Sequence, residues 1–251
     1  MISLTLGLGL FALLGAALLA PLGVVGLRER GTQRAKLFAA LMFCLSGWAT
    51  GVGLGLIAQA GGAGLFDLPV YVGMAASPVL WLQFNLAFTE HTKWLAGRRA
   101  WVLWTPSALF LASAFTNPLH NWITYDLQPA ADVGIVRHLP ADAGWLFGMY
   151  AITLGTIGAV VLLHFAAHSD RLRRAQAITL FCACTIPLIV GFTYIVNAGP
   201  LSGVQLTAQS FVFSAFILWF GVIRFHLLSV PPHVHRILFE NMSDAALVVD
   251  E

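Results

Sequence analysis

The chain has 251 residues, of which 59% are hydrophobic and only 10% are charged. A soluble domain usually has about 25% charged residues, so this composition excludes a water-soluble globular protein. It also excludes a disordered chain, because disorder requires low hydrophobicity and high net charge. The net charge is only +2, and we therefore expect no nucleic-acid partner. The cysteines lie in apolar runs, where they predict no disulfide framework: Cys44, Cys182 and Cys184.

Transmembrane helices are predicted wherever a stretch without Asp, Glu, Lys or Arg reaches the roughly 20 residues that cross a bilayer. Six stretches are long enough: 2–27, 37–66, 68–89, 100–125, 143–169 and 175–223. The last is too long for one helix, and the Gly and Pro residues of segment 197–203 mark a turn near its middle. The sequence therefore predicts an all-α integral membrane protein, a bundle of seven transmembrane helices.

The positions of the basic residues predict the orientation of this bundle, because Lys and Arg near helix ends are retained in the cytoplasm. Twelve of the 13 basic residues follow the first, third, fifth or seventh predicted helix, and Arg137 alone lies on the other side. We therefore expect the N-terminus outside and the C-terminus in the cytoplasm. An even number of helices would place the last basic cluster on the wrong side.

Three prolines lie near the middle of predicted helices, namely Pro78, Pro106 and Pro187 in the third, fourth and sixth. Proline removes one backbone hydrogen bond and can bend a helix. Each bend can be a fixed feature or a hinge.

The C-terminal residues predict a junction with a cytoplasmic domain. Pro231 and Pro232 stop the seventh helix, an amphipathic turn follows at 236–242, and Leu247, Val248 and Val249 begin a strand. A single strand is not stable alone, so we expect the chain to continue beyond Glu251. The predicted division is a membrane domain at 1–228 and a junction with the start of a further domain at 229–251.

This junction resembles the opening of PAS domains, in which a helix with a Phe-Glu-Asn-Met-Ser-Asp pattern leads into an apolar strand. The membrane part is similar to the N-terminal seven-helix region of bacterial and archaeal sensor histidine kinases. Three stretches carry the resemblance: 77–89, 116–120 and 239–250.

The resemblance implies an input domain in the prokaryotic cytoplasmic membrane that senses an unknown small molecule or the state of the membrane lipid. Its signal would pass through a PAS domain to a histidine kinase, or to a diguanylate cyclase. A kinase output implies a homodimer and, in a two-component system, a response regulator as partner.

Polar residues within the predicted helices are candidates for ligand binding, because polar groups usually face the interior of a bundle. The speculative set lies in the outer half: Tyr71, Asn117, Tyr194, Asn197, Gln205 and Gln209. A second group lies in the inner half of the third helix: Gln83, Asn85, Thr89 and Glu90. The alternative for both groups is hydrogen bonding between helices, at about 0.6 kcal/mol per pair.

No catalytic residue, metal site or cofactor is predicted in this chain. A retinal protein needs a lysine inside the seventh helix, whereas Lys36 and Lys93 both lie in predicted loops. A kinase would need a Gly-rich phosphate loop, and the sequence has none. His164 and His168 share one helix face and could ligate haem with His91, or could simply lie at the membrane interface. A small-molecule transporter or permease-like protein remains the alternative function, although no internal repeat is visible.

Overall fold

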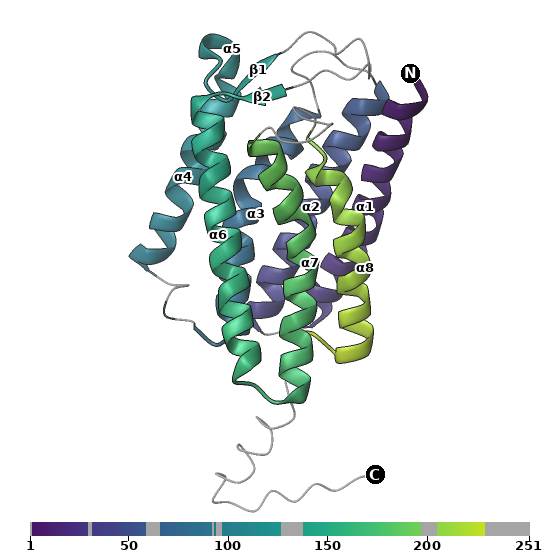
Figure 1. The fold of residues 1–251 in the computed structure, drawn as a ribbon, viewed down its shortest axis with the longest axis vertical. Coiled ribbons are helices and arrows are strands. Elements are labelled where there is room, and N and C mark those ends of the chain that lie inside the picture. Colours follow the sequence, from purple (N-terminus) through teal and green to yellow (C-terminus); the bar gives the residue numbers. More distant parts are fainter. Residues whose placement is uncertain are drawn as a thin grey trace, which may run out of the picture.

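The structure, a computed structural model, describes residues 2–29, 32–58, 66–91, 93, 97–126, 138–196 and 205–228. Long helices dominate it and run alternately up and down (Figure 1). In chain order the elements are α1 (Ile2–Arg28), α2 (Gln33–Ala58), α3 (Asp67–Phe88), α4 (Arg98–Phe115), α5 (Asn117–His120), β1 (Thr124–Asp126), β2 (His138–Pro140), α6 (Asp142–Ala167), α7 (Arg171–Ile195) and α8 (Thr207–Phe225).

The two ends of the bundle differ in what they carry. The start of α1, helix α5 and the two strands lie at one end, which we call the N-terminal end (Figure 1). The strands pair antiparallel, with Thr124 opposite Pro140. At the opposite end Arg28 closes α1, Arg98 opens α4 and Arg171 opens α7, so we call it the basic end. At the basic end, these helices therefore begin or end at the predicted charged turns.

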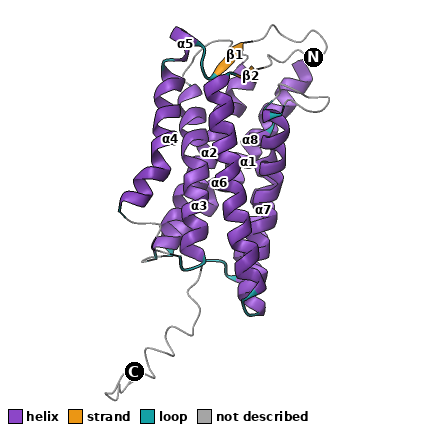
Figure 2. Ribbon diagram, turned by 60° about the vertical axis from the view of Figure 1, so that its left-hand side comes forward, coloured by secondary structure: helices purple, strands orange, loops and turns teal. Residues whose placement is uncertain are grey.

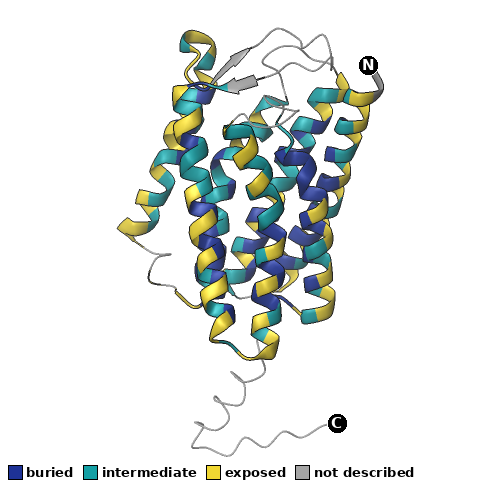
Figure 3. Cartoon of the chain, viewed as in Figure 1, coloured by how far each residue is buried: buried dark blue, intermediate teal, exposed yellow. Residues whose placement is uncertain are grey.

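Six helices are long and apolar enough to cross a membrane, namely α1, α2, α3, α6, α7 and α8. Their outer faces carry large apolar side chains that no other part of the described chain covers (Figure 3). Examples are Leu10 on α1, Val160 on α6 and Phe216 on α8, each more than half exposed. A hydrocarbon environment would cover these faces, as expected for a multi-pass membrane protein. The long window 175–223 is split between α7 and α8, as predicted.

Helix α4 differs from the helix predicted over 100–125. It ends at Phe115, and the backbone N–H of its C-cap Thr116 bonds back to carbonyls of the last turn. A separate short helix, α5, then begins at Asn117. The charge-free part, 100–115, is about 24 Å long at 1.5 Å per residue, shorter than the roughly 30 Å of a hydrocarbon core. With Arg98 and Arg99 in its first turn, α4 is not among the six candidate spans.

Helix α4 also stands at the edge of the bundle, beside α3 (Figures 1 and 2). Its buried residues are few, and Trp101, Val102 and Leu109 are each more than 60% exposed. Phe110 makes its main inward contact, stacking on Phe147 of α6 at 3.9 Å between ring centroids.

The core lies between α1, α2, α3, α6, α7 and α8 and is built from aromatic and aliphatic side chains. Phe38 of α2 and Phe84 of α3 are fully buried and tilt against each other at 5.5 Å. On α8, Trp219 donates its indole N–H to the Leu18 carbonyl of α1 at 2.9 Å. Helix α8, the last described helix, is thus held on several sides.

Candidate functional site

A cavity of about 220 Å³ lies within the bundle and is the candidate functional site. Its walls come from α2, α3, α6, α7 and α8, with Phe110 as the contribution of α4. It reaches from Ile123, Pro140 and Gln205 at the N-terminal end down to Leu218 of α8. Helix α1 contributes none of the described lining residues.

Proline and glycine residues shape these walls. Pro78 and Pro187, both predicted to bend their helices, line the cavity from α3 and α7. On α6, Gly148 and Gly155 let α7 approach closely. A methyl group at these positions would come within 2.2 Å of Ile195 and 2.4 Å of Leu188, respectively.

The lining carries no Asp, Glu, Lys, Arg or His among the described residues. Aromatic, aliphatic and sulfur-containing side chains form most of it, and its polar groups are few. Two of these groups are the indole nitrogens of Trp48 and Trp81, which are buried and have no hydrogen-bond partner in the described part of the chain. Trp48 is only 8% exposed and packs edge-on against Phe211 of α8 at 5.1 Å.

Four of the six residues in the predicted outer set gather at the N-terminal end of the bundle, and two of them line the cavity. Tyr194 and Gln205 contribute to its wall. Gln205 donates its side-chain N–H to the Met74 sulfur at 3.8 Å. Tyr71 lies close enough to Tyr194 for an electrostatic interaction. Gln209 is 6% exposed on α8, and its Oε1 has no partner, but it lies outside the described lining.

The two remaining residues of the set are placed differently. Asn117 accepts a hydrogen bond from the Ile123 backbone N–H at 2.8 Å, which fixes the turn after α5. Its described bond is thus structural. Asn197 lies outside the described residues.

The predicted inner group on α3 divides into buried and exposed members. Asn85 is fully buried, and neither its Nδ2 nor its Oδ1 has a hydrogen-bond partner among the described residues. Gln83 and Thr89 are buried, and the Thr89 hydroxyl donates to the Asn85 carbonyl at 2.8 Å. Glu90 is exposed and pairs with Arg173 at 3.1 Å.

Asn85 lies one helical turn beyond Trp81, and both side chains face Gly158 of α6. A Cβ atom at Gly158 would lie 2.7 Å from Asn85 Nδ2 and 2.7 Å from Trp81 Nε1. The two unpaired nitrogen atoms therefore approach the same place on α6, and glycine there leaves room for both.

His164 and His168 pack ring against ring at 4.6 Å on an exposed face of α6. A hydrogen bond joins His168 Nδ1 to the His164 carbonyl at 2.9 Å. His91 contacts Thr89 Oγ1 at 3.0 Å instead. No group of three or more His, Cys, Asp or Glu in the described residues could hold a metal ion.

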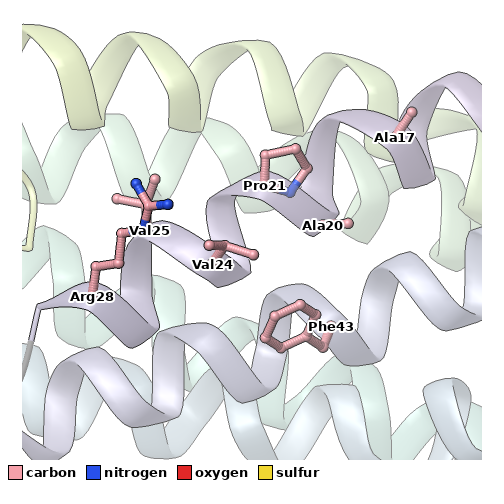
Figure 4. A pocket seen from close by; sticks show the side chains of 7 residues that line it. All are labelled: Ala17, Ala20, Pro21, Val24, Val25, Arg28 and Phe43. Carbon is pink, nitrogen blue, oxygen red and sulfur yellow. The ribbon is translucent and has the colours of Figure 1, made fainter.

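A second hollow, of about 480 Å³, lies against α1 around Pro21 (Figure 4). Small apolar side chains of α1 line it together with Phe43 of α2, and Arg28 stands at one end. Among the described lining residues Arg28 is the sole charged group, and none of the others carries a polar side chain. This surface therefore lacks the converging polar groups with which a binding site orients a small molecule.

A hydrogen bond beside the main cavity joins its last two helices. Proline at 187 has no backbone N–H, so the carbonyl of Ala183 loses its partner within α7. The Ser214 hydroxyl of α8 donates to that carbonyl at 2.6 Å. All three residues line the cavity. The carbonyl that Pro187 leaves without a partner in α7 is thus directly bonded to α8.

At the basic end, two side chains hold the backbone that leaves α8. Gln176 of α7 donates to the Phe225 carbonyl at 2.8 Å, and Arg34 of α2 donates to the Leu228 carbonyl at 3.0 Å. Leu227 and Leu228 are buried in the core. We call Arg34 and Gln176 the exit clamp, because they fix the point at which the described chain leaves the bundle.

The residues that sequence reasoning missed are Trp48, Trp81, Ser214 and the exit clamp. The sequence could have pointed to the tryptophans, since Trp is enriched at membrane interfaces whereas these two lie in the interior of their predicted helices. The sequence could not have pointed to Ser214, because its partner is a carbonyl freed by a proline 27 residues earlier in the sequence.

Comparison with protein families gives one match over most of the chain. The model of the N-terminal 7TM region of histidine kinases matches residues 10–232. No curated protein and no solved structure matches the chain.

Proposed function

Because the chain belongs to the family of N-terminal 7TM regions of histidine kinases, we propose that its cavity is the receiver of a membrane sensor. Occupation of the cavity would change the position of α8, and α8 would pass this change to a histidine kinase in the cytoplasm. The observation that carries the proposal is the hydrogen bond between Ser214 and Ala183, which couples the cavity wall to α8.

Seven crossings with the N-terminus outside are part of this proposal. Helix α4 supports them because it continues the alternation of helix directions between α3 and α6 (Figure 1). Its Arg98 and Arg99 join Arg28 and Arg171 at the basic end. Basic residues gathered at one end favour that end as the cytoplasmic one.

The cavity suits a receiver because its walls belong to several helices that can move relative to one another. A ligand shifts a conformational equilibrium only by its different affinities for the two states. Helix α7, which contains Pro187 and is bonded to α8 beside the cavity, is an element whose position an occupant could change. A coupling free energy of about 1–3 kcal/mol would suffice for a useful switch.

Helix α8 suits the output because its far end lies at the basic end, where the exit clamp holds the backbone of residues 225–228. Movement of α8 would displace this backbone and the cytoplasmic chain that follows it. We propose that PAS and kinase domains following this chain form the output.

The test fills the cavity in the full-length protein. Ala151→Phe places a large side chain in the cavity from α6, whereas Val160→Phe on the same helix enlarges a side chain that is 59% exposed. Autophosphorylation is measured in membrane vesicles. We expect Ala151→Phe to change its rate at least twofold and Val160→Phe to leave it as in the wild type. An unchanged rate for Ala151→Phe, with normal insertion, would refute the coupling of the cavity to the output.

A further inference from the structure

The hydrogen-bonding groups of the cavity wall are of two kinds. Some are closed to an occupant, because the indole nitrogens of Trp48 and Trp81 are sealed by surrounding atoms and the Ser214 hydroxyl is bonded to Ala183. Others belong to residues that line the cavity and are not sealed in this way. Only the second kind can recognise an occupant.

Thr207 supplies an open hydroxyl at the N-terminal end of the cavity. Its side chain is only 8% exposed, and no hydrogen bond joins its Oγ1 to another residue in the described part of the chain. Gly191 of α7 also lines the cavity, and a Cβ atom added there would meet only Thr207 Oγ1, at 4.0 Å. The Thr207 hydroxyl therefore faces space that glycine leaves free. A hydroxyl can both donate and accept a hydrogen bond.

Gln205 adds an amide group two residues before Thr207. Its Nε2 donates to the Met74 sulfur at 3.8 Å, and a thioether sulfur is a weak acceptor. Its Oε1 has no hydrogen-bond partner among the described residues. We call Thr207 and Gln205 the polar mouth of the cavity.

The head group that the polar mouth can bind is electrically neutral. No charged side chain belongs to the described lining of the cavity. An ion entering it would lose its hydration without gaining a partner of opposite charge. A neutral hydroxyl or carbonyl group, in contrast, can bond to both residues of the mouth.

Beyond the polar mouth the cavity is long and mainly apolar. On α8 its wall runs from Thr207 through Phe211 to Leu218, a distance of about 16 Å along the helix. Ser77 of α3 adds one hydroxyl to this part of the lining. A volume of about 220 Å³ over this length makes a narrow space. It fits a single hydrocarbon chain better than a fused ring system.

We propose that the cavity binds a neutral amphiphile whose hydroxyl or carbonyl head bonds to Thr207 and Gln205 and whose hydrocarbon chain lies along α8 towards Leu218. The inference rests on the cavity being the receiver, and it adds the class and the orientation of the ligand. A chain in this orientation passes Pro187 and Ser214, where α7 is bonded to α8.

Four probes separate the required properties. Decan-1-ol has a neutral head on a long chain, decane lacks the head, decyl sulfate carries a charge, and hexan-1-ol has the same head on a shorter chain. Binding of tritiated decan-1-ol to the chain in nanodiscs is measured by equilibrium dialysis. The signal of empty nanodiscs of the same lipid is subtracted, which removes probe dissolved in the bilayer. The unlabelled probes then compete for the saturable part.

We expect decan-1-ol to bind saturably and at least tenfold more tightly than decane or hexan-1-ol, and decyl sulfate not to compete. Thr207→Val keeps the shape of the side chain but removes the hydroxyl. It should weaken decan-1-ol at least threefold and leave decane unchanged, as the loss of one hydrogen bond predicts. Gln205→Leu should have the same effect.

Thr153→Val on α6 is the matched control. The Thr153 hydroxyl bonds to the Met149 carbonyl of its own helix and lies outside the described lining, so all affinities should stay as in the wild type.

Equal competition by decan-1-ol and decane, or an unchanged affinity in both Thr207→Val and Gln205→Leu, would overturn recognition by the polar mouth. Equal affinities of decan-1-ol and hexan-1-ol would overturn the placement of the chain along α8. The absence of saturable binding would overturn the ligand class. None of these results touches the autophosphorylation test with Ala151→Phe, so the two proposals can fail separately.

Discussion

Ser214 shows how a single hydroxyl can link two helices in a membrane. It donates to the carbonyl that Pro187 leaves without a partner in α7. Ser210 lies one turn earlier on α8 and is equally buried, but its hydroxyl donates to Thr207 of its own helix at 2.6 Å. Comparing variants of these two serines therefore distinguishes the effect of a hydrogen bond between helices from that of a hydrogen bond within one helix.

Ser214→Ala should lower the free energy of unfolding by about 0.6 kcal/mol, up to about 1.7 kcal/mol, because the Ala183 carbonyl then has no donor from α8. Ser210→Ala should have a smaller effect, since the backbone of α8 remains paired. Unfolding by SDS in mixed micelles measures both changes. Equal destabilisation by the two variants would argue against a special role for the Ala183 carbonyl.

Among the glycines that the structure describes, Gly144 is the one at which an added Cβ atom would lie closest to other backbone. A Cβ atom there would lie 2.0 Å from the Ile123 carbonyl oxygen, so backbone must move. Gly144→Ala should destabilise the fold by about 1–3 kcal/mol, as overpacking does. Gly55→Ala in α2 meets nothing within 4 Å and should be neutral or stabilising by up to about 1 kcal/mol. The same SDS titration compares them, and a neutral Gly144→Ala would mean that α6 and Ile123 are less closely packed.

At the scale of the elements, the exit clamp determines how firmly the end of α8 is held. Gln176→Met keeps a similar volume but removes the donor to the Phe225 carbonyl. It should speed deuterium uptake in the peptide that covers residues 225–228. Arg173→Met removes the exposed pair with Glu90, which is worth about 0–1 kcal/mol, and the repulsion between Arg173 and Arg34, but it leaves the Gln176 donor intact. It should therefore not speed uptake in that peptide. If deuterium uptake in Gln176→Met is as slow as in the wild type, Arg34 and the buried leucines alone hold this segment.

The segment after α8 carries a second prediction at this scale. If movement of α8 is transmitted mechanically, inserting several Gly and Ser residues after Val230 in the full-length protein should abolish the difference in autophosphorylation between the wild type and Ala151→Phe. A flexible linker dissipates a displacement. Membrane insertion should be unaffected. If the insertion leaves the difference in autophosphorylation between the wild type and Ala151→Phe as large as before, signalling through association of whole bundles is favoured instead.

For the whole molecule, the proposed topology of seven crossings with the N-terminus outside rests on the distribution of basic residues. Cysteine labelling in intact cells, in a background without the native cysteines, should find positions 31, 97 and 169 shielded and positions 62 and 132 accessible from outside. Labelling at position 97 tests whether α4 crosses the membrane, because this position immediately precedes that helix. If position 97 is accessible from outside, α4 does not cross the membrane in the proposed direction.

The sequence predicts most of the helices because a membrane helix is a long stretch without charged residues between charged turns. Arg28, Asp67 and Arg171 lie at helix ends, as this pattern predicts. The pattern does not predict the end of α4, because no charged residue lies near Phe115, where Thr116 and Pro118 begin a new turn. The cavity could not be predicted, since it depends on how Pro187, Gly155 and Trp81 from three helices come together. Polarity alone selected Tyr194 and Gln205, which line the cavity, and equally selected Asn117, whose described bond is structural.

The most direct test of the central claim measures whether the cavity controls α8. Spin labels at positions 28 and 224, at the basic ends of α1 and α8, report their separation by pulsed electron–electron double resonance. The protein is measured in nanodiscs, with the native cysteines replaced. The account predicts that Ala151→Phe shifts the distance distribution relative to the wild type, while Val160→Phe does not. Superimposable distributions for all three proteins would contradict it.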